Sequence, residues 1–266
     1  MDAERLHRPL LYLLPGMDAV ERQHDLVYKR TDSQDLLLDV YRPAPPPTGG
    51  RLPAILFVHG GPLPVDLPLR PKDWGIYRSY GALAAAAGWA GVTFNHRFFA
   101  LRDLPTAAAD VASAIEYVRT RSDALGIAAD RLAVWVFSGG GPLLAPILRE
   151  RPPFVRCLVA DYASLDLRDL PRQVADGVPD EVLHQFSPAA HLAEEQPPVL
   201  VARAGRDTPG LNGSIARFVE AALAANLDLT LLNHPRGRHG FDAEDDLPRT
   251  GEIIAATLSF VRAHLA

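Results

Sequence analysis

The stretch LAVWVFSGGG, residues 132–141, decides the fold expected of this chain. Residues 132–137 form an uninterrupted apolar run, which is typical of a strand buried on both faces. The run leads into Ser138 and then into three glycines that are expected to open a helix. A serine on such a sharp strand-to-helix turn needs small neighbours, and the start of the helix offers N–H groups to developing negative charge. The stretch therefore predicts a parallel sheet with Ser138 as a candidate nucleophile.

One residue departs from the usual Gly-x-Ser-x-Gly pattern of this turn. Val136 stands two positions before the serine, where the pattern has glycine. This departure keeps open a protein that binds a ligand without catalysis. A glycine-rich anion or dinucleotide loop is the weaker alternative, because Gly-x-Gly-x-x-Gly is not matched.

Further apolar runs predict the rest of the sheet. Residues 26–30 and 36–40 alternate like an antiparallel hairpin, and apolar side chains spaced by three or four predict helices around 111–118, 218–225 and 254–265. We expect an α/β fold with a mostly parallel sheet of about eight strands and helices on both faces. The remaining buried strands are predicted at 54–58, 91–94, 155–160, 199–202 and 229–232.

Several segments fit no simple strand–helix unit. The proline-rich residues 45–50 predict a surface turn. Residues 63–80 and 164–198 each follow the carboxyl end of a strand, so they are candidate pocket walls or a small lid; the second contains a short helix around 180–186. We therefore expect the fold to have a small cap or none. Residues 1–22 are expected to be an N-terminal extension.

Composition limits the class of protein. The 266 residues, 48% apolar and 22% charged, predict one domain spanning 1–266. The net charge of −5 and the lack of a basic stripe argue against a nucleic-acid partner. No apolar stretch near the N-terminus is long enough for a signal peptide or a membrane span, and the lone Cys157 cannot form an internal disulfide. We expect a cytoplasmic protein without a membrane partner; a homo-oligomer is left open.

A second glycine turn follows the strand at 54–58. His59-Gly60-Gly61-Pro62 lets the backbone approach a substrate closely, and an oxyanion in acyl transfer needs two such N–H donors. We expect Gly139 and either Gly60 or Gly61 to supply them, since Pro62 has no N–H. An ordinary turn at a strand end is the alternative.

The base and its orienting acid are predicted from position. His239 lies between glycines in a loop after the last predicted strand, where it can reach across the sheet edge; His234, His59 and His96 are less well placed. Asp207 follows the strand at 199–202, one element before that loop. Asp161 is its rival, and Asp242 is a weaker one. The chain order Ser138, Asp207, His239 is the order of the α/β-hydrolases.

These motifs together resemble the α/β-hydrolase superfamily over nearly the whole chain. Within it the chain looks like the dienelactone-hydrolase-like and acetyl-esterase-like branches, with the closest matches in TFNHR (93–97), AGRD (204–207) and RHGFD (238–242). Dienelactone hydrolases use a cysteine nucleophile where this chain has Ser138, so that reaction is not implied. The turn at 59–62 also resembles prolyl-oligopeptidase-like peptidases, but no propeller domain accompanies it.

The resemblance and the residues predict a serine esterase. Ser138, His239 and Asp207 would hydrolyse a small-molecule carboxylic ester through an acyl-enzyme, with no metal or organic cofactor. A peptidase or amidase of the prolyl-oligopeptidase-like type is the alternative, beside the ligand-binding protein mentioned above. Aromatic residues near the active edge are candidate substrate contacts: Trp74, Tyr77, Phe98 and Tyr162.

Overall fold

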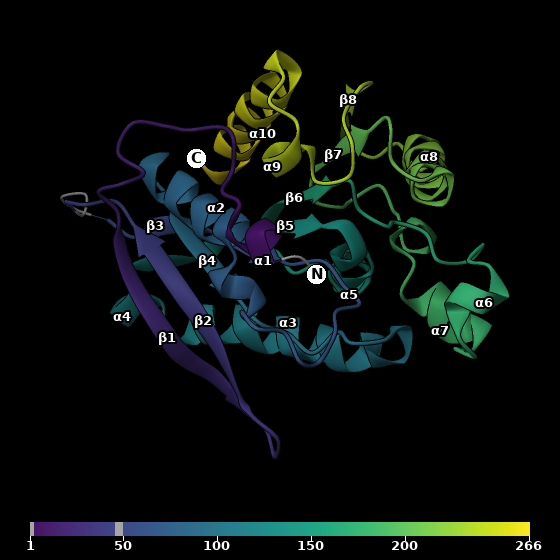
Figure 1. Ribbon diagram of the computed structural model, residues 1–266, viewed down its shortest axis with the longest axis horizontal. Helices are drawn as coiled ribbons and strands as arrows, with labels where there is room; N and C mark the ends of the chain where they lie inside the picture. The colour runs from purple at the N-terminus through teal and green to yellow at the C-terminus, as the bar shows by residue number, and fades with distance from the viewer. Residues whose placement is uncertain (1–2, 46–49) are drawn as a thin grey trace.

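An eight-stranded sheet forms the centre of the protein in a computed structural model that describes residues 3–45 and 50–266 (Figure 1). The strand order is β1-β2-β4-β3-β5-β6-β7-β8, which confirms the predicted α/β class and strand number. The strands are β1 (Glu21–Arg30), β2 (Asp35–Arg42), β3 (Leu52–Val58), β4 (Ala90–Phe94), β5 (Ile127–Phe137), β6 (Val155–Asp161), β7 (Val199–Ala204) and β8 (Leu229–His234).

The sheet is antiparallel only at its beginning. β1 pairs antiparallel with β2, and β2 pairs antiparallel with β4, whereas every pairing from β4 through β8 is parallel. The carboxyl ends of the parallel strands consequently lie at one edge of the sheet. The loops that follow Val58, Phe137, Asp161, Ala204 and His234 all leave from that edge, which is where ligands bind in such sheets.

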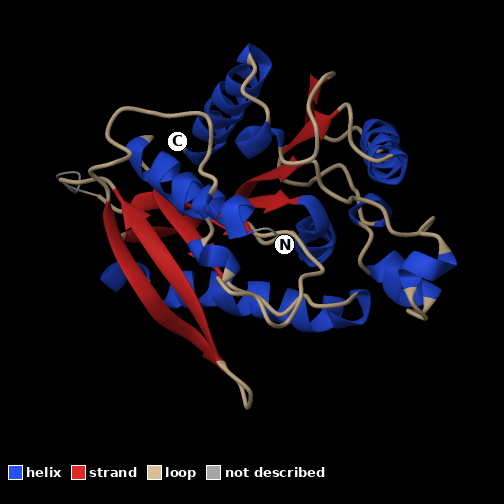
Figure 2. Ribbon diagram, viewed as in Figure 1, coloured by secondary structure: helices blue, strands red, loops and turns tan. Residues whose placement is uncertain are grey.

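Residues 132–137 of β5 show why this part of the strand is apolar at every position. Val134 and Val136 pack into one core with residues of the long helix α3 (Leu104–Thr120) and of α8 (Pro209–Ala224). Trp135 and Phe137 pack into the opposite core with α2 (Gly75–Ala86) and α10 (Pro248–Leu265). Successive side chains of a strand point to opposite faces, so a strand covered on both faces has no polar position. Figure 2 shows the helices surrounding the sheet.

Short helices complete the chain. The predicted helices at 111–118 and 254–265 lie within α3 and α10. The helix predicted at 218–225 corresponds to α8, which ends one residue earlier, at Ala224. Residues 180–185 form the short helix predicted in the loop at 164–198. That helix is α7 (Asp180–Gln185), and the remaining α-helices are α1 (Ala3–His7), α4 (Ser122–Leu125), α5 (Ala145–Glu150), α6 (Arg172–Ala175) and α9 (Phe241–Glu244).

The helix after Ser138 differs from the expectation. Residues Ser138–Leu144 form a 3₁₀ helix, and the α-helix α5 begins only at Ala145. Pro142 has no N–H for an α-helical hydrogen bond back to residue 138, and glycines favour the α-helix least after proline. The tighter turn keeps the backbone after Ser138 close to the end of β5.

Two further sequence predictions concern membrane spans and the proline-rich turn. No helix among the described residues is long and apolar enough to cross a membrane. The turn predicted at 45–50 lies mostly outside the described residues, since 46–49 are not among them.

Candidate active site

Ser138 occupies a strained turn directly after β5. Its φ is 53°, in the left-handed region that non-glycine residues rarely adopt. The following glycines make the turn possible, because a Cβ on Gly139 would overlap the carbonyl oxygen of Gly61 and one on Gly141 would overlap that of Ser164. Strain of this kind persists only when the surrounding packing holds it in place, and it is concentrated at functional sites. The local structure therefore has the geometry of a nucleophile elbow, built on the glycines that follow the serine.

Val136 is accommodated without disturbing this turn. It is fully buried in β5, where it pairs with Val58 of β3 and Ala160 of β6. The close approach to the serine comes from another element, since a Cβ on Gly60 would lie 2.9 Å from the Ser138 Cβ. The missing glycine of the usual pattern thus leaves the geometry of the elbow intact.

Three side chains from separate loops form one hydrogen-bonded chain. The Ser138 Oγ lies 2.8 Å from the His239 Nε2, and the His239 Nδ1 lies 2.6 Å from the Asp207 Oδ2. A carboxylate accepts only, so the His239 Nδ1–H donates to Asp207 and leaves the Nε2 lone pair facing the serine hydroxyl. The His239 side chain is 38% exposed and that of Asp207 is 2% exposed. This arrangement can take a proton from Ser138.

Backbone hydrogen bonds hold the two loops of this chain together. The Gly205 N–H donates to the His234 carbonyl at 2.8 Å, and the Arg206 N–H donates to the Gly237 carbonyl at 2.8 Å. A side chain on Gly205 would meet the backbone of Pro235. The glycines beside Asp207 and His239 therefore serve close loop packing, rather than only the freedom of His239 expected from the sequence.

The two rival carboxylates belong to a different cluster. The buried Asp242 accepts hydrogen bonds from the Tyr80 hydroxyl at 2.7 Å and from the Tyr162 hydroxyl at 2.9 Å. Burial raises the pKa of Asp242, although the tyrosine hydrogen bonds act against the rise. Burial, followed by the charge of Asp242, raises the pKa of Asp161 well above its usual range. Neither carboxylate hydrogen-bonds His239 in the described part of the chain.

The turn after β3 is held by two buried histidines. The rings of His59 and His96 are stacked with centroids 3.6 Å apart, and burial lowers the pKa of both, that of His96 to about 4. The His96 N–H donates to the His59 Nε2 at 3.3 Å, so the neutral His59 carries its proton on Nδ1 and donates it to the Gly60 carbonyl at 2.7 Å. This bond fixes the orientation of the Gly60–Gly61 peptide.

That orientation separates the two glycine N–H groups. The C=O and N–H of a trans peptide point in opposite directions, so the Gly61 N–H points away from the His59 ring. It donates to no group among the described residues. The Gly60 N–H instead donates to the Tyr77 hydroxyl at 3.2 Å. Of the two glycines, only Gly61 has an N–H that is free for a ligand.

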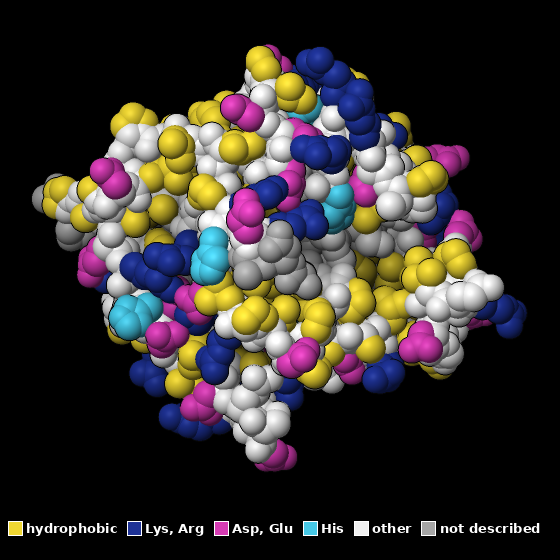
Figure 3. Space-filling view, in the orientation of Figure 1, with side chains coloured by type: hydrophobic (Ala, Val, Ile, Leu, Met, Phe, Trp, Pro, Cys, Tyr) yellow, Lys and Arg dark blue, Asp and Glu magenta, His cyan; other side chains and the backbone are white. Residues whose placement is uncertain are grey.

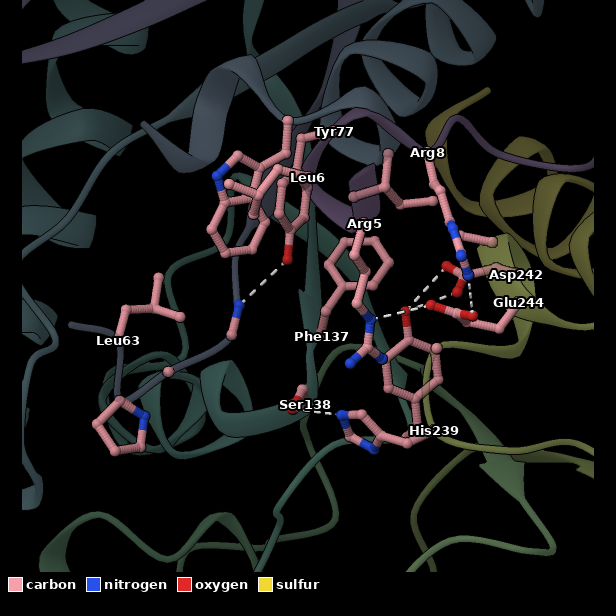
Figure 4. A pocket seen from close by; sticks show the side chains of 18 residues that line it. Arg5, Leu6, Arg8, Leu63, Tyr77, Phe137, Ser138, His239, Asp242 and Glu244 are labelled. Carbon is pink, nitrogen blue, oxygen red and sulfur yellow. Dashed lines mark hydrogen bonds and ion pairs between the residues drawn. The ribbon is translucent and has the colours of Figure 1, made fainter. Parts of the chain in front are cut away.

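A cavity of about 270 Å³ opens over Ser138 and His239 (Figure 4). Three of the four aromatic residues singled out in the sequence, Trp74, Tyr77 and Tyr162, line it. Phe98 does not, because its ring is buried beneath the turn, where a Cβ on Gly61 would touch it. Its predicted substrate contact is therefore corrected to support of the Gly61 backbone. Other apolar lining residues are Leu6, Leu63, Ile76 and Phe137.

The walls of this cavity come from both ends of the chain. Leu63, Trp74 and Tyr77 belong to the segment 63–80, whereas no residue of 164–198 is among the described lining residues. The sequence did not identify the N-terminal helix α1, which contributes Arg5 and Leu6. Gly75 lets this helix approach, since a side chain there would overlap the backbone of His7 and Arg8.

The charged groups of the site are not arranged around a metal position. Among the described residues, no group of three or more His, Cys, Asp or Glu side chains is placed to hold a metal ion. The sequence prediction of chemistry without a metal or organic cofactor stays a prediction.

The sequence is similar to that of known esterases. A family model described as BD-FAE matches residues 38–148. The chain is 28% identical, over 265 residues, to Esterase LipC of Mycobacterium tuberculosis, and the match covers 86% of this chain and 62% of that protein. The chain therefore spans less than two thirds of the length of this relative.

The three-dimensional structure is similar to that of esterase 2 of the planctomycete Thermogutta terrifontis. The apo form has a TM-score of 0.74 at 23% sequence identity, with 95% of this chain and 98% of that chain covered. The butyrate-bound form has a TM-score of 0.71 at 23% identity and covers 95% and 97% of the two chains. A form phosphoramylated by tabun has a TM-score of 0.73 at 24% identity, covering 95% and 98%.

Proposed function

We propose that this protein, which has the α/β-hydrolase fold, is a serine esterase that cleaves small carboxylic esters in two steps. The observation that carries the proposal is the hydrogen-bonded chain Ser138–His239–Asp207, with distances of 2.8 Å and 2.6 Å. Ser138 is the nucleophile, His239 the general base, and Asp207 the group that orients the histidine.

The first step forms an acyl-enzyme. The Ser138 Oγ attacks the ester carbonyl carbon while its proton passes to the His239 Nε2. Asp207 stabilises the resulting imidazolium through the Nδ1–H that it already accepts. His239 then gives the proton to the departing alcohol oxygen as the C–O bond breaks. In the second step, water loses a proton to the same nitrogen and attacks the acyl group, which releases the acid and restores Ser138.

The oxyanion of each tetrahedral intermediate needs donors that are already in place. The Gly61 N–H is oriented by the His59 bond to the Gly60 carbonyl and makes no hydrogen bond among the described residues. We assign it as one donor and the Gly139 N–H, in the first turn after Ser138, as the second. The sequence left Gly60 as the alternative donor, but the Gly60 N–H donates to the Tyr77 hydroxyl. We therefore assign Gly60 to anchoring the turn and not to binding the oxyanion. Preorganised donors of this kind are usually worth a factor of ~10² to 10³ in kcat each.

The cavity supports an ester with a short, apolar acyl group. Its lining is largely aromatic and aliphatic, and about 270 Å³ is small for a long chain. Butyrate is bound in one of the similar esterase structures, which makes butyryl a suitable acyl group to test. A location in the cytoplasm, the absence of membrane and nucleic-acid partners, and the single-domain organisation remain predictions from the sequence.

The decisive experiment measures ester turnover together with labelling of the serine. We expect hydrolysis of p-nitrophenyl butyrate, stoichiometric labelling of Ser138 by paraoxon, and a loss of about a million-fold in kcat in Ser138→Ala. Mass spectrometry of the labelled peptide locates the modification. Ser113→Ala is the matched control, because Ser113 lies on α3 and only donates to the Ala109 carbonyl.

The same experiment separates the alternatives. Cleavage of aminoacyl anilides in preference to p-nitrophenyl esters would favour a peptidase or amidase. A folded protein that resists paraoxon and turns over neither substrate would instead be a ligand-binding protein, and the proposal would be wrong.

A further inference from the structure

A second, more polar cavity adjoins the candidate active site. Its volume is about 510 Å³, and it shares His239, Glu244, Arg5 and Arg8 with the apolar cavity. Four arginines line it although the whole chain has a net charge of −5. Figure 3 shows Lys and Arg side chains together with His and acidic side chains over the region where α1, α9 and the end of β8 lie. The complete lining is Arg5, Arg8, Arg206, Asp207, Thr208, Arg238, His239 and Glu244.

Two of these arginines are held by carboxylates of the protein. Arg238 bonds the Asp245 Oδ1 through its Nε at 2.7 Å. The Arg8 Nη1 bonds the Glu244 Oε2 at 2.6 Å. These contacts keep both guanidinium groups in place and leave them little capacity for a ligand.

The other two arginines have unused donors. Arg5 bonds the Glu244 Oε1 through its Nε at 2.9 Å, but no acceptor among the described residues bonds its two terminal nitrogens. In Figure 4 the Arg5 side chain extends from α1 toward Ser138 and His239. The exposed Arg206 likewise has no side-chain partner in the part of the chain that the structure describes. A guanidinium group presents paired N–H donors that match a carboxylate.

His239 relates this cavity to one side of the scissile bond. The histidine that accepts the serine proton later delivers it to the leaving oxygen, so the leaving group lies on the His239 side. His239 lies between the two cavities and lines both; Asp207 lines only the arginine-rich one, whereas Phe137, Tyr77 and Gly61 line only the apolar one. The acyl group therefore fits the apolar cavity and the alcohol fits the cavity with the arginines.

We propose that the alcohol portion of the substrate carries a carboxylate that binds Arg5 and Arg206. This inference rests on the proposed esterase function and adds the class of its substrate: short-chain acyl esters of hydroxy acids. Glu244 orients Arg5 through its Nε and leaves the two terminal nitrogens for the ligand.

The test compares two esters that differ in charge alone. One is the butyrate ester of para-hydroxybenzoate, and the other is the butyrate ester of para-hydroxybenzamide, in which a neutral amide replaces the carboxylate. The measured quantity is kcat/KM for the carboxylate ester divided by kcat/KM for the amide ester. Differences in leaving-group reactivity cancel when this ratio is compared between variants. We expect Arg206→Gln and Arg5→Gln each to lower this ratio by about tenfold.

Arg30→Gln is the matched control. It removes the same charge from a side chain that is 76% exposed on β1, outside both cavities. We expect it to leave the ratio unchanged. We also expect the wild-type ratio to decrease as salt increases, since charges near the surface are screened.

The outcomes are distinct. A ratio that is unchanged in both Arg206→Gln and Arg5→Gln overturns the inference, even when both variants lose activity in proportion, and so does an equal fall in Arg30→Gln. If Arg5→Gln and Arg206→Gln lower kcat/KM only for the butyrate ester of para-hydroxyphenyl phosphate, the arginines bind a phosphate, and the inference of a carboxylate is overturned. If the wild-type protein hydrolyses none of these esters, the esterase proposal itself fails; if it hydrolyses them with a ratio that neither Arg206→Gln nor Arg5→Gln changes, only the present inference fails.

Discussion

Two groups of polar residues lie side by side at the carboxyl edge of the sheet, and they differ in what surrounds them. Ser138 and His239 face the apolar cavity, Asp207 faces the adjoining cavity with the arginines, and the His239 side chain is 38% exposed. Tyr80, Tyr162 and Asp242 form a second cluster in which every member is buried, and Tyr162 and Asp242 also line the apolar cavity. The two groups meet where the Tyr162 ring lies edge-on to the His239 ring, with centroids 5.0 Å apart.

Both carboxylates are buried, so the groups differ in the hydrogen-bond partners of the carboxylate and in the exposure of the histidine. Asp207 accepts hydrogen bonds from the His239 Nδ1–H at 2.6 Å and from the Thr208 N–H at 2.7 Å. Among the described residues, the side chains that donate to Asp242 are the neutral Tyr80 and Tyr162, and burial raises the pKa of Asp242. The first group has the geometry to pass a proton, whereas the second holds the Tyr162 ring against His239.

Exchanging Asp207 and, separately, its rival Asp161 has the largest expected effect. Asp207→Asn should reduce kcat about 10⁴-fold, because an amide no longer favours the Nδ1–H tautomer or stabilises the imidazolium. Asp161→Asn, which alters the rival carboxylate at the end of β6, should reduce kcat less than tenfold. Steady-state kinetics with p-nitrophenyl butyrate measures both. A greater loss in Asp161→Asn would show that the roles of the two carboxylates are reversed.

The buried cluster of Tyr80, Tyr162 and Asp242 should affect how the free energy of unfolding depends on pH. The folded-state pKa of Asp242 lies above its unfolded value of 3.8. As pH rises past that value the unfolded chain ionises first, so wild-type stability decreases relative to Asp242→Asn. The substitution loses tyrosine hydrogen bonds and should cost about 1–3 kcal/mol near pH 4, with a smaller cost near pH 7. Urea unfolding at the two pH values measures this; a cost that grows with pH would mean that Asp242 is ionised in the folded protein.

The smallest effect is expected at Tyr77, which lies between the apolar cavity and the turn at 59–62. Tyr77→Phe removes the acceptor of the Gly60 N–H and should lower kcat about tenfold through loss of order in the turn. KM for p-nitrophenyl butyrate should change little, because the ring that lines the cavity is retained. Tyr117→Phe on α3 is the control, since its ring lies outside both cavities. A rise in KM without a change in kcat would indicate that Tyr77 binds substrate and does not anchor Gly60.

Local patterns in the chain were sufficient to predict the sheet and the positions of its active edge. Apolar runs mark β3 to β7 because strands covered on both faces carry few polar residues, and the glycines after Ser138 mark the turn because backbone passes within contact distance there. These signals lie within a few residues of one another. They are therefore visible without knowledge of the rest of the fold.

Contacts between distant segments were decided only in three dimensions. Arg5 reaches Glu244 across nearly the whole length of the chain, the Tyr77 hydroxyl engages Gly60, and Phe98 lies beneath Gly61 outside the cavity. The choice of Asp207 over Asp161 likewise depends on how two loops pack through backbone hydrogen bonds. None of these pairings leaves a periodic trace in the sequence, because each depends on how strands and loops that are far apart in the chain are brought to one edge of the sheet.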